Sequence, residues 1–178
     1  MKKYIHLIPL IIYPYAYLIY LMVLFNVNDI SSIMSDFMTD TLIITVISFT
    51  LLALMCATLS IVYTLKGKYS VCDATKMNLI VKTIHIPAYI FHFIMFIYGV
   101  LIGIWGIAFV MIALIVDLLT ISLTGINAIS CAIGLRKQGL ISSKKAIIGV
   151  FASFVFCIDF IVAIIYLKDC KKISINKV

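Results

Sequence analysis

The chain contains no glutamate, and aspartate supplies all 7 of its acidic residues. This absence excludes chemistry that requires glutamate, such as the zinc-binding His-Glu-x-x-His helix of metalloproteases. The phosphate-binding G-x-x-x-x-G-K-[ST] loop and the G-x-S-x-G turn of serine hydrolases are also missing. Because no enzymatic motif is present, the sequence predicts a non-enzymatic protein with no cofactor and no catalytic residues.

Closely spaced cysteines are also missing. Cys56, Cys72, Cys131, Cys157 and Cys170 are widely scattered and form no C-x-x-C pair. Three of them lie within apolar runs, where a thiol usually acts as a small hydrophobic group. The spacing therefore indicates neither a disulfide framework nor a thiol redox centre.

Charge is scarce as well, because only 12% of the 178 residues are charged while 65% are hydrophobic. The mean hydropathy of +1.23 indicates more apolar surface than one soluble core of this size could bury. The net charge of +7 comes from short basic clusters between apolar runs. This pattern is typical of membrane topology signals rather than of nucleic-acid binding. We expect an all-α bundle of transmembrane helices, one integral membrane domain over 1–178, with the lipid bilayer as its partner and no nucleic acid.

About 20 apolar residues are needed to cross the hydrocarbon layer. The stretch 84–135 would be about 78 Å long as one helix, so it must fold back on itself. Gly103-Ile104-Trp105-Gly106 is the natural hinge of such a helical hairpin. The N-terminus opens like a signal peptide, but its apolar run is too long and lacks a cleavage site. We predict five crossings, at about 7–25, 41–65, 86–104, 107–135 and 146–167.

Orientation follows from the distribution of lysine and arginine. Ten basic residues fall inside if the N-terminus is cytoplasmic, and the outside loop 26–40 carries only acidic charges, which favours a multi-pass protein of the plasma membrane in this orientation. The basic C-terminal tail, with Lys168, Lys171, Lys172 and Lys177, disagrees, because five crossings place it outside. Either the tail breaks the rule or one span does not cross fully. The loop 66–85 forms either a short amphipathic helix on the inner leaflet or an extension of the third crossing.

A polar seam runs along the predicted fourth crossing. Asp117, Thr120, Thr124 and Asn127 recur at spacings of three, four and three, which places them on one helix face. An aspartate in mid-membrane costs about 2.5 to 3.5 kcal/mol on insertion scales, so this face should meet protein or water. By helix rise, Asp159 of the fifth crossing lies at nearly the same depth.

If these helix faces pack inward, the two carboxyl groups would lie in a polar pocket where they share a proton or hold a cation. Tyr98, and Thr50 or Ser48, lie close enough in depth to supply hydroxyl groups. The interpretation that we favour at this point is structural: a protonated aspartate hydrogen-bonds a neighbouring helix and so holds the bundle together.

On the third crossing, His85, Tyr89 and His92 are spaced by four and three residues. His92 is expected to hydrogen-bond a neighbouring helix through Thr124 or Asn127. A metal site is not expected, because further ligands at that depth are missing.

Small residues indicate where helices approach closely. Gly99 and Gly103 form a G-x-x-x-G pair that is expected to pack against Ala128 and Ala132 of the fourth crossing. Gly149 and Ser153 repeat the spacing in the fifth crossing. These grooves predict packing within the chain first and a homo-oligomer second.

The segment MNLIVKTIHIPAYIFHF, residues 77–93, resembles small multi-pass membrane proteins of unknown function from low-GC Gram-positive bacteria. The resemblance implies a membrane location and carries no activity, cofactor or site residue.

Two functions follow as expectations. The first is a non-enzymatic membrane protein that acts through helix–helix contacts, as a subunit or as an accessory or immunity-like partner of another membrane protein. The alternative is a small transporter or channel subunit for a proton, cation or small solute that uses Asp117 and Asp159.

Overall fold

The structure, a computed structural model, describes residues 2–26 and 32–176. Within these, it describes the side chains of all residues except 2–4, 17, 20–26, 32–39, 42–43, 105, 108–109 and 172–176. Every described element is a helix, in the order η1 (Lys2–Leu7), α1 (Ile8–Asn26), α2 (Ser32–Leu65), α3 (Val71–Leu101), η2 (Gly103–Gly106), α4 (Ile107–Lys137), α5 (Ser143–Ala152) and α6 (Ile158–Asn176). The predicted all-α class is thus confirmed.

Three stretches among the described residues are long and apolar enough to cross a membrane, namely Ile44–Leu65 of α2, Val71–Leu101, which is all of α3, and Val110–Lys137 of α4. The helix α1 coincides with the first predicted crossing, and a shorter apolar helical segment, Ile5–Ala16, runs from the end of η1 into α1. These three stretches support a membrane protein, but they do not confirm the predicted count of five crossings.

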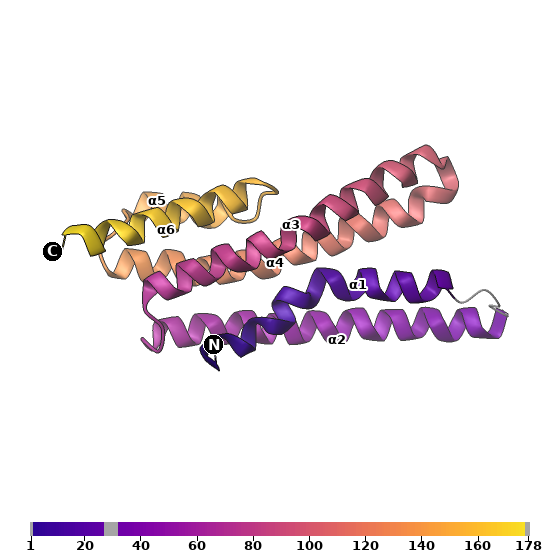
Figure 1. Cartoon of the computed structure of the whole chain (residues 1–178), viewed down its shortest axis with the longest axis horizontal. Coiled ribbons are helices and arrows are strands. Elements are labelled where there is room, and N and C mark those ends of the chain that lie inside the picture. The colour runs from indigo at the N-terminus through magenta and orange to yellow at the C-terminus, as the bar shows by residue number, and fades with distance from the viewer. Residues whose placement is uncertain (1, 27–31, 177–178) are drawn as a thin grey trace.

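The predicted helical hairpin is confirmed, with α3 and α4 running antiparallel on either side of the turn at η2 (Figure 1). Gly103 has φ 72°, a backbone conformation that only glycine adopts readily. A Cβ atom on Gly106 would lie 1.8 Å from the carbonyl oxygen of Gly99, so the two helices touch through bare backbone. Helix α3 begins at Val71 and continues without a break to Leu101. Most of the segment 66–85 therefore extends the helix of the third predicted crossing and does not form a separate amphipathic helix.

The single helix predicted over 146–167 is wrong. Helix α5 ends at Ala152, the chain reverses over residues 153–157, and α6 runs back alongside (Figure 1). With 10 residues, α5 is about 15 Å long, half the thickness of the hydrocarbon layer. At the break Cys157 has φ 65°, outside the helical range, and Asp159 lies in the first turn of α6, where a carboxylate offsets the positive end of the helix dipole. A hydropathy profile does not indicate this break, because the residues on both sides of it are apolar.

Because α6 returns toward the end from which α5 started, the last turns of α6 lie at the same end of the bundle as η1 and the loops 66–70 and 138–142 (Figure 1). Lys168 and Lys171 therefore lie at the end of the bundle that holds the other basic segments, whereas Lys177 is outside the described residues.

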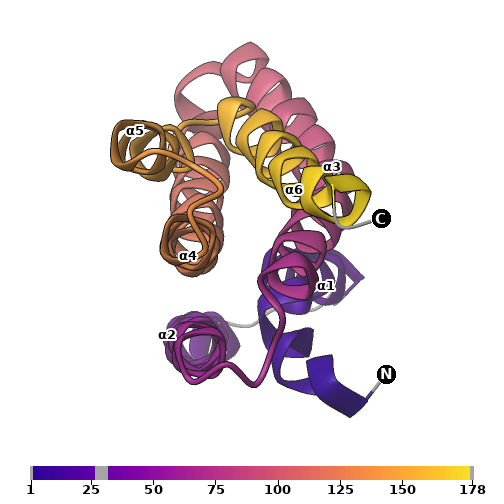
Figure 2. The same ribbon diagram turned by 90° about the vertical axis from the view of Figure 1, so that its left-hand side faces the viewer.

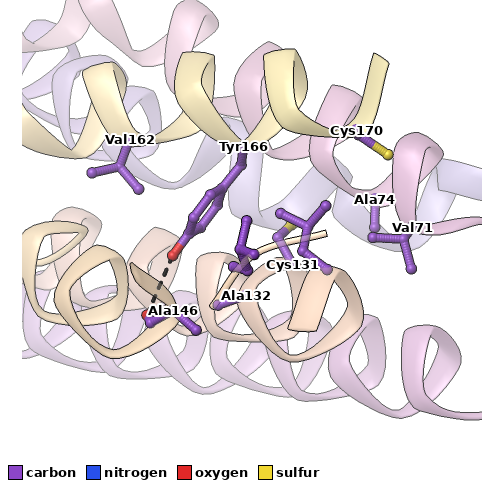
Figure 3. Close-up of a cluster of buried hydrophobic side chains, with 10 residues drawn as sticks. Val71, Ala74, Cys131, Ala132, Ala146, Val162, Tyr166 and Cys170 are labelled. Atoms are coloured by element: carbon purple, nitrogen blue, oxygen red, sulfur yellow. Dashed lines mark hydrogen bonds between the residues drawn. The ribbon is translucent and has the colours of Figure 1, made fainter. Parts of the chain in front are cut away.

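The short hairpin packs on the long one, with α5 against α4 and α6 against α3 (Figure 2). A buried cluster from all four helices joins them, and the Tyr166 hydroxyl donates a hydrogen bond to the carbonyl of Ala146 across it (Figure 3). A disulfide between Cys72 and Cys170 ties the start of α3 to α6. The expectation of no disulfide is therefore wrong, because a pairing over 98 residues leaves no local spacing pattern.

Candidate functional site

The interface of α3 with its neighbours is lined by polar side chains. Asn78, Lys82, His85, Tyr89 and His92 follow each other on α3 at spacings of four, three, four and three residues, which keeps them on one face. All of them except the partly buried Tyr89 are buried. In the antiparallel hairpin this face meets the polar seam of α4, so two polar stripes lie inside an otherwise apolar bundle.

A buried ion pair of this interface joins α3 to α6. The Lys82 ammonium lies 2.7 Å from Asp159 Oδ2, and the two side chains are only 2% and 5% exposed. The other carboxylate oxygen accepts a hydrogen bond from the backbone N–H of Phe160 at 2.8 Å. Lys82 also donates to the Thr124 hydroxyl at a longer 3.5 Å. Both side chains are thus enclosed by protein.

A second pair lies nearer to the hairpin turn, where His92 Nδ1 is 2.5 Å from Asp117 Oδ1. The histidine is buried, whereas the Asp117 side chain is 22% exposed. The seam therefore faces protein at Asp117, as expected. Sequence reasoning predicted Thr124 or Asn127 as the partner of His92, whereas the structure shows this histidine bound to the Asp117 carboxylate.

The rest of the predicted seam is buried and serves packing. Asn127 accepts a hydrogen bond from Ser60 of α2 at 2.6 Å and donates one to Asn78 of α3 at 3.4 Å. The hydroxyls of Thr120 and Thr124 donate to carbonyls of their own helix. Such bonds satisfy a hydroxyl without linking helices.

The two acids do not form one site. Asp117 and Asp159 are bound by His92 and Lys82, which lie ten residues apart on α3, about 15 Å by helix rise. The estimate of a shared depth assumed a straight fifth crossing, and the break before Asp159 removes that assumption. Tyr98 is 62% exposed and lies outside the interface.

The hydroxyls expected from α2 are not at the acids either. Thr50 hydrogen-bonds Tyr13 of α1 at 2.9 Å, and Ser48 is exposed.

The predicted packing of Gly99 and Gly103 on Ala128 and Ala132 is wrong. Gly99 meets Gly106, and Gly103 forms the turn with open space beside it. An antiparallel hairpin pairs residues near its turn with each other, so Ala128 and Ala132 lie far down α4, where Ala132 joins the cluster against α6.

The predicted Gly149–Ser153 groove does form a contact within the chain. A Cβ atom on Gly149 would lie 2.1 Å from the Tyr166 hydroxyl, so this glycine makes room for α6. Ser153 is buried, and its hydroxyl donates to the Gly149 carbonyl.

Lys82 is the residue that sequence reasoning missed, because it was counted among the basic residues of the loop 66–85. A signal was present in the spacing. The row His85, Tyr89 and His92 continues backward by three residues to Lys82 and by four more to Asn78.

The arrangement offers proton donors and acceptors rather than a metal site: among the side chains that the structure describes, no three His, Cys or Asp residues gather as metal ligands. Buried His85 donates through Nε2 to the Leu10 carbonyl at 3.1 Å, and its Nδ1 has no hydrogen-bond partner among the described residues. Titratable groups thus line α3 from Lys82 to His92. No family model, curated protein or solved structure shows significant similarity to this chain.

Proposed function

We propose that the protein is a small multi-pass membrane transporter, or the transporting subunit of one, in which the Lys82–Asp159 pair is the transport site. The observation that carries this proposal is the burial of that ion pair directly after the break between α5 and α6. The transported species is a proton, a cation or a small solute. The His92–Asp117 pair is a second protonatable group along the same face of α3.

Ionisable residues inside a membrane are expensive, and they commonly mark ion pathways or proton relays. Burying two charges also costs more than packing two apolar side chains of similar size, so an ion pair is a poor choice for stability alone. Broken helices at membrane depth are tolerated where protein or a cavity covers the free backbone groups, and they commonly form substrate sites in transporters. Lys82 and Asp159 combine both features.

We further propose that the chain crosses the plasma membrane four times, through α1 to α4, and that α5 and α6 form a re-entrant hairpin. Both termini then lie in the cytoplasm, together with the basic loops, as the positive-inside rule requires. Asp159 lies about 13 Å deeper than Lys168 by helix rise.

Labelling with a membrane-impermeant thiol reagent tests this topology in a variant without native cysteines. Gln138→Cys and Lys168→Cys should react from the same side, and Ile104→Cys in the hairpin turn from the other. All three positions are exposed. Lys168 reacting from the same side as Ile104 would restore five complete crossings and refute the re-entrant hairpin.

Flux into liposomes tests the transport site. Protein is reconstituted around a pH-sensitive dye, and a pH gradient is imposed with and without Na⁺ or K⁺ outside. The double variant Lys82→Met/Asp159→Leu should fall to the level of empty liposomes. The matched control Lys145→Met/Asp169→Leu removes the other lysine–aspartate pair of α6 and should transport like wild type. Equal flux in both double variants, or wild-type flux no greater than that of empty liposomes, would refute the proposal.

The expectation of a non-enzymatic subunit or accessory partner, acting through helix contacts as part of a homo-oligomer or beside another membrane protein, stays a prediction. This prediction can be told apart from the transporter, because a subunit or accessory partner should give no flux as an isolated protein. The Lys82→Met/Asp159→Leu variant should then bind its partner normally.

A further inference from the structure

A cavity of about 440 Å³ opens directly on the Lys82–Asp159 pair. It lies between α3 and the segment formed by the 153–157 turn and the start of α6. Its volume is within the usual range for small-molecule sites. Apart from the ion pair, its walls are apolar, and four of the lining side chains are aromatic: Tyr89, Phe93, Phe156 and Phe160.

The two charged residues differ in how firmly they are held. Asp159 is fixed at the start of α6, where its carboxylate also accepts the backbone N–H of Phe160. Lys82 reaches it through a flexible four-carbon stem, and its ammonium also donates a long, 3.5 Å hydrogen bond to Thr124. The carboxylate is therefore the fixed charge of the cavity, and the ammonium is the charge that can move away.

The aromatic walls distinguish between possible ligands. The face of an aromatic ring carries partial negative charge, so it attracts a cation and disfavours an anion. The rings of Tyr89 and Phe156 meet edge to face with their centroids 5.2 Å apart, directly beside the ion pair. A carboxylate surrounded by aromatic rings is the combination that recognises an organic cation.

We propose that this cavity binds a lipophilic organic cation, such as a hydrophobic amine or a quaternary ammonium or phosphonium ion, which replaces the Lys82 ammonium at Asp159. The inference rests on the proposed function, because it names the substrate class of the same transport site. As the cation enters, one N–H bond of the Lys82 ammonium breaks, its electron pair stays on Nζ, and the proton leaves to the aqueous solvent. The cavity thus holds one positive and one negative charge before and after exchange, which avoids burying an unpaired charge.

This exchange couples the cation to a proton. Because one proton is released for each cation bound, affinity should rise about tenfold per pH unit while Lys82 is protonated in the free protein. A cation moving one way through the site would therefore be exchanged for a proton moving the other way.

Tetraphenylphosphonium is a suitable probe, because tetraphenylborate is an anion of nearly the same shape. Titration calorimetry of the purified full-length protein should show saturable binding of the phosphonium and none of the borate. Repeating the titration in buffers with different heats of ionisation should reveal the release of one proton. Equal binding of both probes, or no saturable binding of the phosphonium, would overturn the proposal.

Variants assign the binding to the cavity. Asp159→Asn should abolish phosphonium binding, whereas Lys82→Met should keep or strengthen it, because the competing ammonium is gone. The charge-neutral double variant Lys82→Met/Asp159→Asn should also lack binding, which covers the case in which Asp159→Asn alone fails to fold. Binding that disappears equally in Lys82→Met, or that persists in the double variant, would contradict the exchange.

The aromatic contribution has a matched control. Phe160→Leu should weaken phosphonium binding by about 2- to 30-fold. Phe154→Leu should leave it unchanged, because Phe154 comes from the same turn but lies against Gly125 of α4, outside the cavity. Equal effects of the two substitutions would show that the aromatic walls of the cavity do not contribute to phosphonium binding.

The binding and flux measurements test the organic-cation site and the transporter separately. Phosphonium binding without any transport in liposomes would leave the cation site standing and refute the transporter. Flux of protons or metal cations that depends on Lys82 and Asp159, without phosphonium binding, would refute the organic-cation site alone.

Discussion

Helix α6 carries two lysine–aspartate pairs with opposite surroundings. Near its start, Asp159 pairs with Lys82 of α3, and both side chains are almost completely buried. Ten residues later, Asp169 pairs with Lys145 of α5 at 2.5 Å; this carboxylate is also buried, with 9% of its side chain exposed, but the lysine side chain is 45% exposed. The chemistry is the same, and the distances differ little. What separates the pairs is access to water.

This difference determines what each pair contributes. A pair with one exposed partner, such as Lys145–Asp169, gains little, typically up to about 1 kcal/mol, because the exposed ammonium stays solvated when the pair is broken. A buried pair gains little over apolar packing, yet the loss of one partner strands a charge and costs several kcal/mol. The pair at Asp169 therefore belongs to the surface of the bundle. The pair at Asp159 belongs to the interior of the bundle, where neither charge can lose its partner without a large cost. Its position beside a cavity connects it to the proposed function.

The largest effect should come from breaking the inner pair. Asp159→Ala leaves the Lys82 ammonium buried without a counter-charge, so the free energy of unfolding should fall by about 3 to 5 kcal/mol. Asp169→Ala should lower it by about 1 kcal/mol or less. Unfolding in mixed micelles, followed by circular dichroism, measures both. Equal losses would mean that burial does not separate the two pairs.

The next effect concerns the outer end of α6, where the Cys72–Cys170 disulfide lies beside Asp169. Cys170→Ser should cost about 2 to 4 kcal/mol in oxidised protein, because the unfolded chain regains the freedom of a loop of 98 residues. Adding a reductant should bring the wild type to the same stability as the variant. If oxidised wild type and variant unfold alike, the covalent link does not hold this end of α6.

Packing between the two pairs should matter less. Gly149→Ala places a methyl group 2.1 Å from the Tyr166 hydroxyl and should cost about 1 to 3 kcal/mol through overpacking. Tyr166→Leu in the same chain should recover part of this loss. Ser143→Ala, at an exposed position of α5, is the control and should be neutral. No difference between the two alanine variants would show that α5 and α6 separate easily at this contact.

The smallest effect on stability is expected from removing both inner charges together. Lys82→Met/Asp159→Leu should unfold within about 1 kcal/mol of wild type, or be more stable, because no charge is left unpaired. Compared with Asp159→Ala in the same assay, this result would show that the inner pair is dispensable for folding. A loss as large as that of the single variant would instead make the pair a structural anchor.

Local patterns predicted much of the architecture. The glycines at 103 and 106 indicated the hairpin turn, since a long apolar stretch must reverse and glycine permits it. The three-four-three spacing identified the buried face of α4 at Thr120, Thr124 and Asn127. The same rule, applied one turn further back on α3, would have reached Lys82.

The candidate site was predicted only in part. Asp159 and Asp117 were found as intramembrane acids, but each was assigned the wrong partner. Their depths were estimated along straight helices, and no periodicity in an apolar segment indicates that the chain turns back at 153–157. The prediction that Tyr98 supplies a hydroxyl group to the acids is wrong for a related reason: depth alone does not say which face of a helix meets protein.

The sequence by itself determined the membrane class, the turn at Gly103–Gly106 and the polar face of α4, because composition, glycine and helical periodicity act over a few neighbouring residues. Only the tertiary structure decided that α5 and α6 reverse, that Lys82 neutralises Asp159 and that Cys72 joins Cys170. The last two contacts link residues 77 and 98 positions apart. Both contacts join the two hairpins, and the energy of an ion pair or a disulfide depends on that proximity rather than on any spacing along the chain.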